Sequence, residues 1–186
     1  MNQTKTNYFI LTGAMGAGKS TILKQLRALG VRAIDEPARQ ILAEQRSIGS
    51  EGVPDRDQKL FNELLLSRSI AQFQKMQDYQ RPVIFDRGIP GNIGYASLFG
   101  LSIQAAKVAA DKYRYNNLVF FAPGWEAIYE NDDERKMSFE QANEFGNNIK
   151  TIYEALGYNV VDVPFDPPLA RANFILEAVE DNMPPD

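Results

Sequence analysis

The stretch Gly13-Ala14-Met15-Gly16-Ala17-Gly18-Lys19-Ser20 decides the fold of this chain, because it matches G-x-x-x-x-G-K-[ST], the phosphate-binding loop called Walker A. The apolar run at 8–11 before it has strand chemistry. After it, residues 21–29 carry apolar side chains at helical spacing, and Gly30 is a typical helix stop. Strand, glycine loop and helix are the context that the motif requires. We therefore prefer a nucleotide triphosphate site to the alternative of a glycine-rich turn before a helix.

Each residue type in this loop has a physical reason. The glycines let the backbone curl, so that successive N–H groups converge on phosphate oxygens at the positive end of the following helix. Lys19 is expected to reach the β- and γ-phosphates and to act in catalysis, and the Ser20 hydroxyl is expected to ligate Mg²⁺. The residues expected to bind ATP or GTP are Gly13, Ala14, Met15, Gly16, Ala17, Gly18, Lys19, Ser20 and Thr21.

Composition limits the chemistry available to this chain. Its 186 residues are most simply one domain, 1–186, and the net charge of −4 disfavours nucleic acid as the main partner. It has no cysteine and no histidine, so a general base must be Asp, Glu, Lys or Tyr. No apolar run approaches the ~18 residues of a membrane span, and residues 1–7 lack the apolar core of a signal peptide. We expect a cytoplasmic protein.

Strand and helix patterns alternate along the rest of the chain. Strands are expected at 31–34, 83–85, 117–121 and 158–163. Helices are expected over 37–45, 55–79, 102–113 and 138–156, from 166 onward, and in part over 89–100. Capping boxes at 55–58 and 138–141, and caps at Ser102 and Asp166-Pro167, mark four helix starts. This order predicts a three-layer α/β/α P-loop NTPase with a five-stranded parallel sheet, in which ligands bind beyond the carboxyl ends of the strands.

Asp86 and Arg87 follow the apolar strand 83–85 directly. A carboxylate at this place is expected to hold Mg²⁺ and to act in catalysis, as a Walker B aspartate does. The alternative is a turn or helix-capping aspartate. Arg87 can bind an anionic acceptor bidentately and take part in catalysis. The alternative for Arg87 is a structural ion pair, with Glu36 as its candidate partner.

Glu36 ends the strand 31–34 and precedes a proline, which places a carboxylate at the same edge of the sheet. It is the candidate catalytic base, because a carboxylate there can accept the proton of an attacking hydroxyl. Arg39, three residues later, is a candidate for binding the acceptor together with Glu36 and Arg87. An i,i+3 ion pair that stabilises the helix start, at ~0.3 kcal/mol, is an equally good interpretation of Glu36 and Arg39.

A charged segment between the fourth strand and the 138–141 capping box is a candidate lid over about 124–137. Phosphoryl transfer requires positive charge at the γ-phosphate and exclusion of water, and Arg135 is the expected catalytic cation there. The alternative is a solvated run of charges. Trp125 and Tyr129, spaced i,i+4 on the same segment, are interpreted as packing residues.

Taken together, these motifs resemble those of nucleoside and nucleotide kinases. Asp86-Arg87 is similar to the acidic residue and arginine of thymidylate and deoxynucleoside kinases, and Glu36-Pro37 to the base-bearing strand end of the latter. Over almost its full length the chain resembles the AAA_28-type family of predicted P-loop ATPases and kinases. That resemblance rests on 36–41, 85–90, 125–129 and 131–135. Gly88 stands where thymidylate kinases carry an aromatic residue or histidine, and their lid arginine pattern is absent.

The resemblance and the residues together imply an ATP- and Mg²⁺-dependent phosphotransferase that acts on a small acceptor, of which a nucleoside is one candidate. A nucleotide-binding regulatory switch and a plain ATPase are the alternatives, because the phosphate-binding loop serves all three equally well. The sequence predicts neither the acceptor, nor ATP against GTP, nor the oligomeric state.

Overall fold

A five-stranded parallel sheet forms the centre of the computed structural model, which describes residues 3–130 and 137–183. Its middle strand is β2 (Tyr8–Gly13), which pairs with β4 (Val83–Asp86) on one side and β6 (Leu118–Ala122) on the other. β3 (Arg32–Ile34) pairs with β4, and β7 (Asn159–Asp162) pairs with β6. The order β3-β4-β2-β6-β7 confirms the predicted sheet and places the ends of β2, β3 and β4 side by side.

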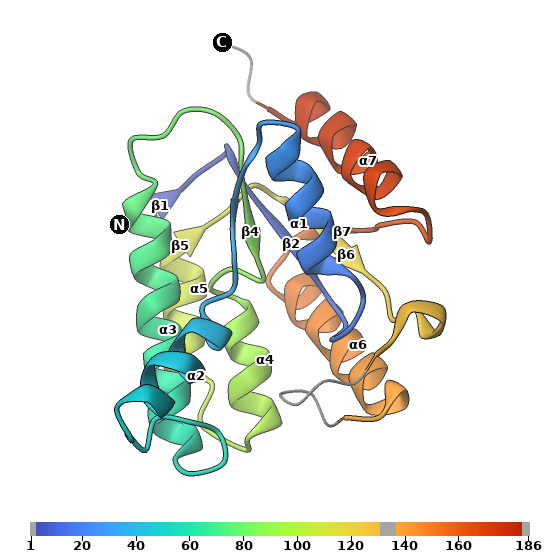
Figure 1. The fold of residues 1–186 in the computed structure, drawn as a ribbon. Coiled ribbons are helices and arrows are strands. Elements are labelled where there is room, and N and C mark those ends of the chain that lie inside the picture. Colours follow the sequence, from blue (N-terminus) through green and yellow to red (C-terminus); the bar gives the residue numbers. More distant parts are fainter. Residues whose placement is uncertain (1–2, 131–136, 184–186) are drawn as a thin grey trace.

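Helices cover both faces of this sheet, as predicted (Figure 1). Phe9 and Leu11 of β2 pack in the core with α1 (Lys19–Ala28) and α7 (Pro168–Asp181). Tyr8 and Ile10 face the other way, towards α3 (Gln58–Lys75), α4 (Gly91–Leu98), α5 (Gln104–Lys112) and α6 (Phe139–Ala155). α2 (Ala38–Ser47) packs against α3. Within residues 3–130 and 137–183, no helix is both long and apolar enough to cross a membrane.

Helix boundaries show where local patterns predicted correctly and where they did not. The capping box at Ser138 and Gln141 is confirmed. The expected start of α3 at 55 is wrong, because the backbone N–H groups of Arg56 and Asp57 both donate to the carbonyl of Val53 in a turn. Asp57 is the N-cap instead, and its carboxylate accepts from the N–H of Leu60. The expected end at 79 is also wrong, since the helix stops at Lys75.

Of two other expected caps, Ser102 is wrong as the N-cap of α5, whereas Asp166-Pro167 includes the N-cap of α7. The N-caps of α5 and α7 are Ile103 and Pro167, and neither helix start has a side-chain cap. Ser102 lies one residue earlier and accepts from the N–H of Gln104 at 3.4 Å. On α7 the inward stripe runs through Arg171, Ala172 and Ile175, whereas Leu169 is 50% exposed.

A second, two-stranded sheet was not predicted. β1 (Gln3–Thr4) pairs in parallel with β5 (Tyr113–Arg114), and the N–H of Lys5 donates to the carbonyl of Arg114. Strands of two residues are too short to show alternation in a sequence, so no local pattern could have indicated this pairing.

Candidate active site

The carboxyl ends of β2, β3 and β4 meet at a cleft of about 960 Å³. This volume lies at the upper end of the range for small-molecule sites, ~300–1,000 Å³. Ten of the residues predicted for the site line the cleft: Met15, Gly16, Gly18, Lys19, Ser20, Thr21, Glu36, Arg39, Asp86 and Arg87. Side chains from separate parts of the chain thus meet because parallel strands end at one edge of the sheet.

The loop between β2 and α1 contains glycines in a backbone conformation that other residues adopt only under strain. Gly16 and Gly18 have φ of +77° and +79°. Lys19 begins α1 and is only 8% exposed, with its Nζ 2.7 Å from the carbonyl oxygen of Ala14. The first N–H groups of α1 have no partners within the helix, so this end of α1 is suited to an anion.

Three residues of the predicted loop do not line the cleft. Gly13, Ala14 and Ala17 are buried, and the two alanine side chains belong to the core on the α1 side of the sheet. The N–H of Ala14 donates to the carbonyl of Ala122, so it is directed at β6. A Cβ on Gly13 would lie 2.1 Å from that same carbonyl oxygen. These residues fix the loop against the sheet.

Gly146 of α6, which no sequence pattern indicated, supports the loop from the other face of the sheet. A Cβ at this position would lie 2.8 Å from both the Cα and the Cβ of Ala14, closer than ordinary contacts. Glycine therefore lets α6 approach the loop backbone directly. Only this tertiary contact distinguishes Gly146 from a glycine that merely weakens a helix.

We expect Gly146→Ala to lower the melting temperature and weaken nucleotide binding. Alanine favours the helix by ~1 kcal/mol, but overpacking against Ala14 costs ~1–3 kcal/mol and displaces the loop. Thermal unfolding and titration with a nucleotide would measure the two effects. The matched control is Asn148→Ala, an exposed position on the same helix, which should change neither. A Gly146→Ala protein that is more stable and binds nucleotide normally would contradict this account of the contact.

Arg87 connects the loop to the end of β3. Its side chain is 3% exposed, its Nη1 donates to the carbonyl of Gly13 at 2.8 Å, and its Nε lies 3.1 Å from Oε1 of Glu36. The guanidinium also lies over the rings of Phe145 and Tyr95, at 5.3 and 5.9 Å from their centroids. The ion pair with Glu36 that was the structural alternative for Arg87 is therefore present. Its role in binding an acceptor stays a prediction.

The turn that carries Arg87 is held by two tyrosines that sequence analysis did not identify. Arg87 has φ of +59°, which is rare for a residue with a side chain. The hydroxyl of Tyr153 donates to the Arg87 carbonyl, and the hydroxyl of Tyr115 accepts from the N–H of Ile89 at 3.0 Å. These buried contacts keep the strained turn, and with it the direction of Asp86, in one conformation.

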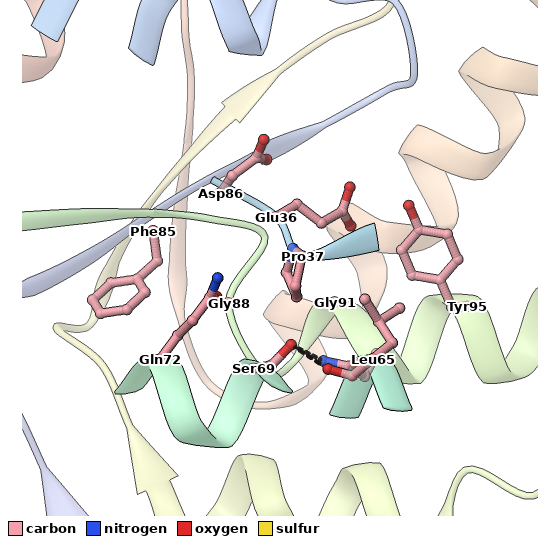
Figure 2. Close-up of a pocket in the computed structure, with 11 residues that line it drawn as sticks. Glu36, Pro37, Leu65, Ser69, Gln72, Phe85, Asp86, Gly88, Gly91 and Tyr95 are labelled. Atoms are coloured by element: carbon pink, nitrogen blue, oxygen red, sulfur yellow. Dashed lines mark hydrogen bonds between the residues drawn. The ribbon is translucent and has the colours of Figure 1, made fainter. Parts of the chain in front are cut away.

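A small pocket lies between the segment after β3, the end of β4, α3 and α4, and Figure 2 shows the Glu36 carboxylate at one side of it, directed towards Tyr95. The pocket measures about 10 Å³, roughly the space of one water molecule. Burial is the main cause that raises the pKa of Tyr95 well above its usual value, and Glu36 adds to it by charge and by a hydrogen bond. Tyr95 therefore stays protonated and can donate to Glu36.

The floor of this pocket presents a hydrogen-bond acceptor. Ser69 donates its hydroxyl proton to the carbonyl of Leu65, so it can only accept from the amide of Asn92. That amide also donates to the carbonyl of Ile89, which uses both of its protons. The Oδ1 of Asn92 is left buried without a partner among the described residues. A water or a hydroxyl in the pocket would satisfy it.

Asp86 is suited to a metal ion by its charge and by an unsatisfied oxygen. Its Oδ1 is buried and has no hydrogen-bond partner in the described part of the chain. No cluster of three acidic residues that could hold a metal by itself is present in residues 3–130 and 137–183. Mg²⁺ commonly takes only one or two protein ligands beside phosphate oxygens and waters, so Asp86 with the Ser20 hydroxyl fits that ion.

Burial raises the pKa of Asp86 from 3.8 to about 6, with Lys19 opposing and Glu36 reinforcing the shift. Because the folded-state pKa is the higher one, this group costs no stability below about pH 4, where both states are protonated. The cost grows between about pH 4 and 6 and is complete above. We expect Asp86→Asn to raise the stability of the nucleotide-free protein by about 1–2 kcal/mol at pH 7.5 and by less at pH 5. Chemical denaturation at both pH values would measure it.

The exposed Asp111 of α5 provides the control, since Asp111→Asn should give the same small change at both pH values. A loss of stability in Asp86→Asn at pH 7.5 would show instead that the folded protein favours the charged carboxylate.

The other residues predicted for the site are Arg39 and those of the candidate lid. Arg39 is exposed on α2 and lines the cleft. Arg135 and the rest of 131–136, the centre of the predicted lid, lie outside the described residues. Trp125 packs against Phe165 and Tyr129 against Phe139, with centroids 5.3 and 5.6 Å apart, which confirms that both are packing residues.

Solved structures of similar fold include those of NadR and of two small-molecule kinases. The chain matches NadR protein in complex with NR at a TM-score of 0.65 and 18% identity, covering 95% of this chain and 51% of that one. Deoxyadenosine kinase from M. mycoides with bound dATP matches at a TM-score of 0.59 and 16% identity, covering 93% of this chain and 99% of that one. Shikimate kinase from Aquifex aeolicus vf5 matches at a TM-score of 0.52 and 18% identity, covering 94% of this chain and 97% of that one. At these identities the likeness shows a kinase-like P-loop fold.

The chain spans about half the length of NadR and nearly the full length of the two kinases. No match was found among curated protein sequences. The family model AAA_28, described as an AAA domain, matches residues 8–170, which include the phosphate-binding loop, Glu36, Asp86 and Arg87. The chain therefore belongs to the AAA_28 family.

Proposed function

We propose that this protein is an ATP- or GTP-dependent and Mg²⁺-dependent phosphotransferase that acts on a small acceptor such as a nucleoside. The observation that carries the proposal is that one cleft is lined by the phosphate-binding loop and, from the neighbouring strand ends, by Glu36 and Asp86. A nucleotide-binding loop alone would suit any NTPase. A second carboxylate in the same cleft gives the reaction a candidate base.

The loop and the start of α1 would hold the donor. Backbone N–H groups at the glycines and the first turn of α1 donate to the phosphates, where the helix dipole also favours negative charge. Lys19 leaves the carbonyl of Ala14 and pairs with the β- and γ-phosphates. Since charge accumulates on the transferred group and the leaving oxygen, a fixed ammonium at this place lowers the barrier.

Glu36 would act on the acceptor. Its carboxylate is held by Arg87 and Tyr95, so it meets an incoming hydroxyl in a fixed orientation. It accepts the hydroxyl proton as the oxygen attacks the γ-phosphorus in line with the leaving group. Arg39, at the rim of the cleft, binds the outer part of the acceptor.

Ser20 and Asp86 would hold Mg²⁺ beside the phosphates. When bound, the ion neutralises charge on the β- and γ-oxygens. The buried and otherwise unpartnered Oδ1 of Asp86 supports this assignment.

The similar structures support a small acceptor. Small molecules are bound in these structures: NR in NadR, shikimate in a shikimate kinase at 15% identity, and dATP in deoxyadenosine kinase. The proposal includes a single kinase-like domain over 1–186 that works in the cytoplasm on small molecules. The net charge of −4 disfavours nucleic acid as the main partner.

The proposal can be tested by measuring ADP formation from ATP and Mg²⁺ in the presence of pooled nucleosides, sugars and small alcohols. We expect one pool to raise ADP formation at least tenfold above the rate without acceptor, and mass spectrometry to find a phosphorylated member of that pool. Nucleotide hydrolysis that no acceptor stimulates would favour the ATPase. Tight binding with neither hydrolysis nor transfer would favour the regulatory switch.

A further inference from the structure

Arg171 of α7 is a buried cation without an ion pair, at a place where the proposed mechanism does not use it. Its side chain is 2% exposed, and its Nε and Nη2 have no hydrogen-bond partner among the described residues. No carboxylate in residues 3–130 and 137–183 forms an ion pair with it. Because an unpaired buried charge destabilises a fold, such a group calls for a physical reason.

The side chain of Arg171 contacts the phosphate-binding loop and the residues beside it. Nη1 donates to the carbonyl of Ala17 at 2.9 Å, and it would lie 3.1 Å from a Cβ built on Gly18. The guanidinium also lies over the ring of Trp125, 5.7 Å from its centroid. Gly18 and Ile128 line the cleft whereas Arg171 does not, so Arg171 lies behind the loop.

The hydrogen bond from Arg171 to Ala17 can orient a backbone N–H that binds phosphate. The carbonyl of Ala17 and the N–H of Gly18 belong to the same peptide group, and in a planar trans peptide they point in opposite directions. Arg171 draws the carbonyl inward, which turns the N–H of Gly18 outward. That N–H has no acceptor among the described residues. An unpaired N–H facing the cleft is what a phosphate oxygen requires.

We infer that Arg171 is a positioning residue for the phosphates of the nucleotide donor, acting by aiming the Gly18 N–H and by adding positive charge behind the loop. This inference rests on the proposed nucleotide site but not on the acceptor or on Glu36. It gives the buried cation a reason, because a bound polyphosphate would supply close negative charge. Among the described residues, Asp166 acts on Arg171 through its charge but forms no ion pair with it.

The test compares Arg171→Met with the wild type by calorimetric titration with two probes, Mg²⁺-AMP-PNP and inorganic tripolyphosphate. We expect the Met variant to bind both probes 10- to 100-fold more weakly. We also expect its ligand-free melting temperature to equal or exceed that of the wild type, since a buried charge has been removed. A purely structural arginine would give the opposite pair of results, a lower melting temperature and unchanged affinity.

Further variants keep the inference testable if the Met variant does not fold. Arg171→Lys keeps the charge, and Arg171→Gln keeps a donor without the charge, so affinity for both probes should fall in the order wild type, Lys, Gln. Arg32→Met removes one positive charge from an exposed position on β3 and should bind both probes as the wild type does.

Affinity of the Gln variant within twofold of the wild type would overturn the inference. So would a loss for AMP-PNP that leaves tripolyphosphate binding unchanged, because that result would place Arg171 at the nucleoside rather than the phosphates. A wild-type protein that binds neither probe would refute the proposed nucleotide site itself. The two failures are therefore distinguishable.

Discussion

Replacing Lys19 by methionine should lower the rate of phosphoryl transfer by about 10²–10³-fold while leaving the protein folded. The side chain is 8% exposed, and its Nζ donates to the loop carbonyls of Gly13 and Ala14 at 3.5 and 2.7 Å. Methionine fills the same space without a charge, so the expected loss is that of one electrostatic contact to the transition state, ~3–4 kcal/mol. Initial rates of ADP formation at saturating nucleotide would measure it.

Lys24→Met is the matched control, because Lys24 is exposed on the same helix. It should retain the wild-type rate. Because Lys19→Met alters kcat more than nucleotide affinity in this account, a variant that merely binds nucleotide more weakly and reaches the wild-type rate at saturation would contradict the catalytic role of Lys19.

Glu36→Gln should lower the rate of transfer to the acceptor by roughly 10²–10⁴-fold, the usual contribution of a general base. Nucleotide affinity should remain within a few-fold of the wild type, because Glu36 lies beyond β3 rather than in the loop. The stability should also fall, by about 1–3 kcal/mol, since the buried Arg87 loses its charged partner. Single-turnover rates and chemical denaturation would separate the two effects.

Glu44→Gln controls for the loss of an ion pair, because Glu44 pairs with Arg68 at 2.9 Å on α2 and α3. Its rate should be unchanged. If Glu36→Gln lost stability but kept its rate, Glu36 would serve only to hold Arg87. That result would favour a nucleotide-dependent switch over a kinase.

Much of this site could be predicted because it follows local rules. The loop is contiguous in sequence, and Glu36 and Asp86 each follow an apolar strand directly, so a parallel sheet must bring them to one edge. Asp57 illustrates the limit of local pattern. Residues 55–58 contain two aspartates in sequence, and only the turn through Val53 determines which of them caps α3.

The supports behind the site could not be predicted, because their partners are distant in the chain. Arg171 and Ala17 are 154 residues apart, and Tyr153 and Arg87 are 66 apart. Gly146 matters only because α6 crosses the loop at Ala14. No periodicity or motif encodes such contacts, and on α7 a buried arginine, Arg171, lies in the inward stripe while Leu169 is exposed.

The fate of the γ-phosphoryl group tests the central claim most directly. ATP labelled at the γ-phosphate, with Mg²⁺ and the acceptor pools, should give a labelled acceptor from the wild-type protein. Glu36→Gln and Lys19→Met should give at most about one hundredth of that product in the same time. Label recovered only as inorganic phosphate, at a rate that no acceptor changes and that Glu36→Gln does not lower, would contradict the account.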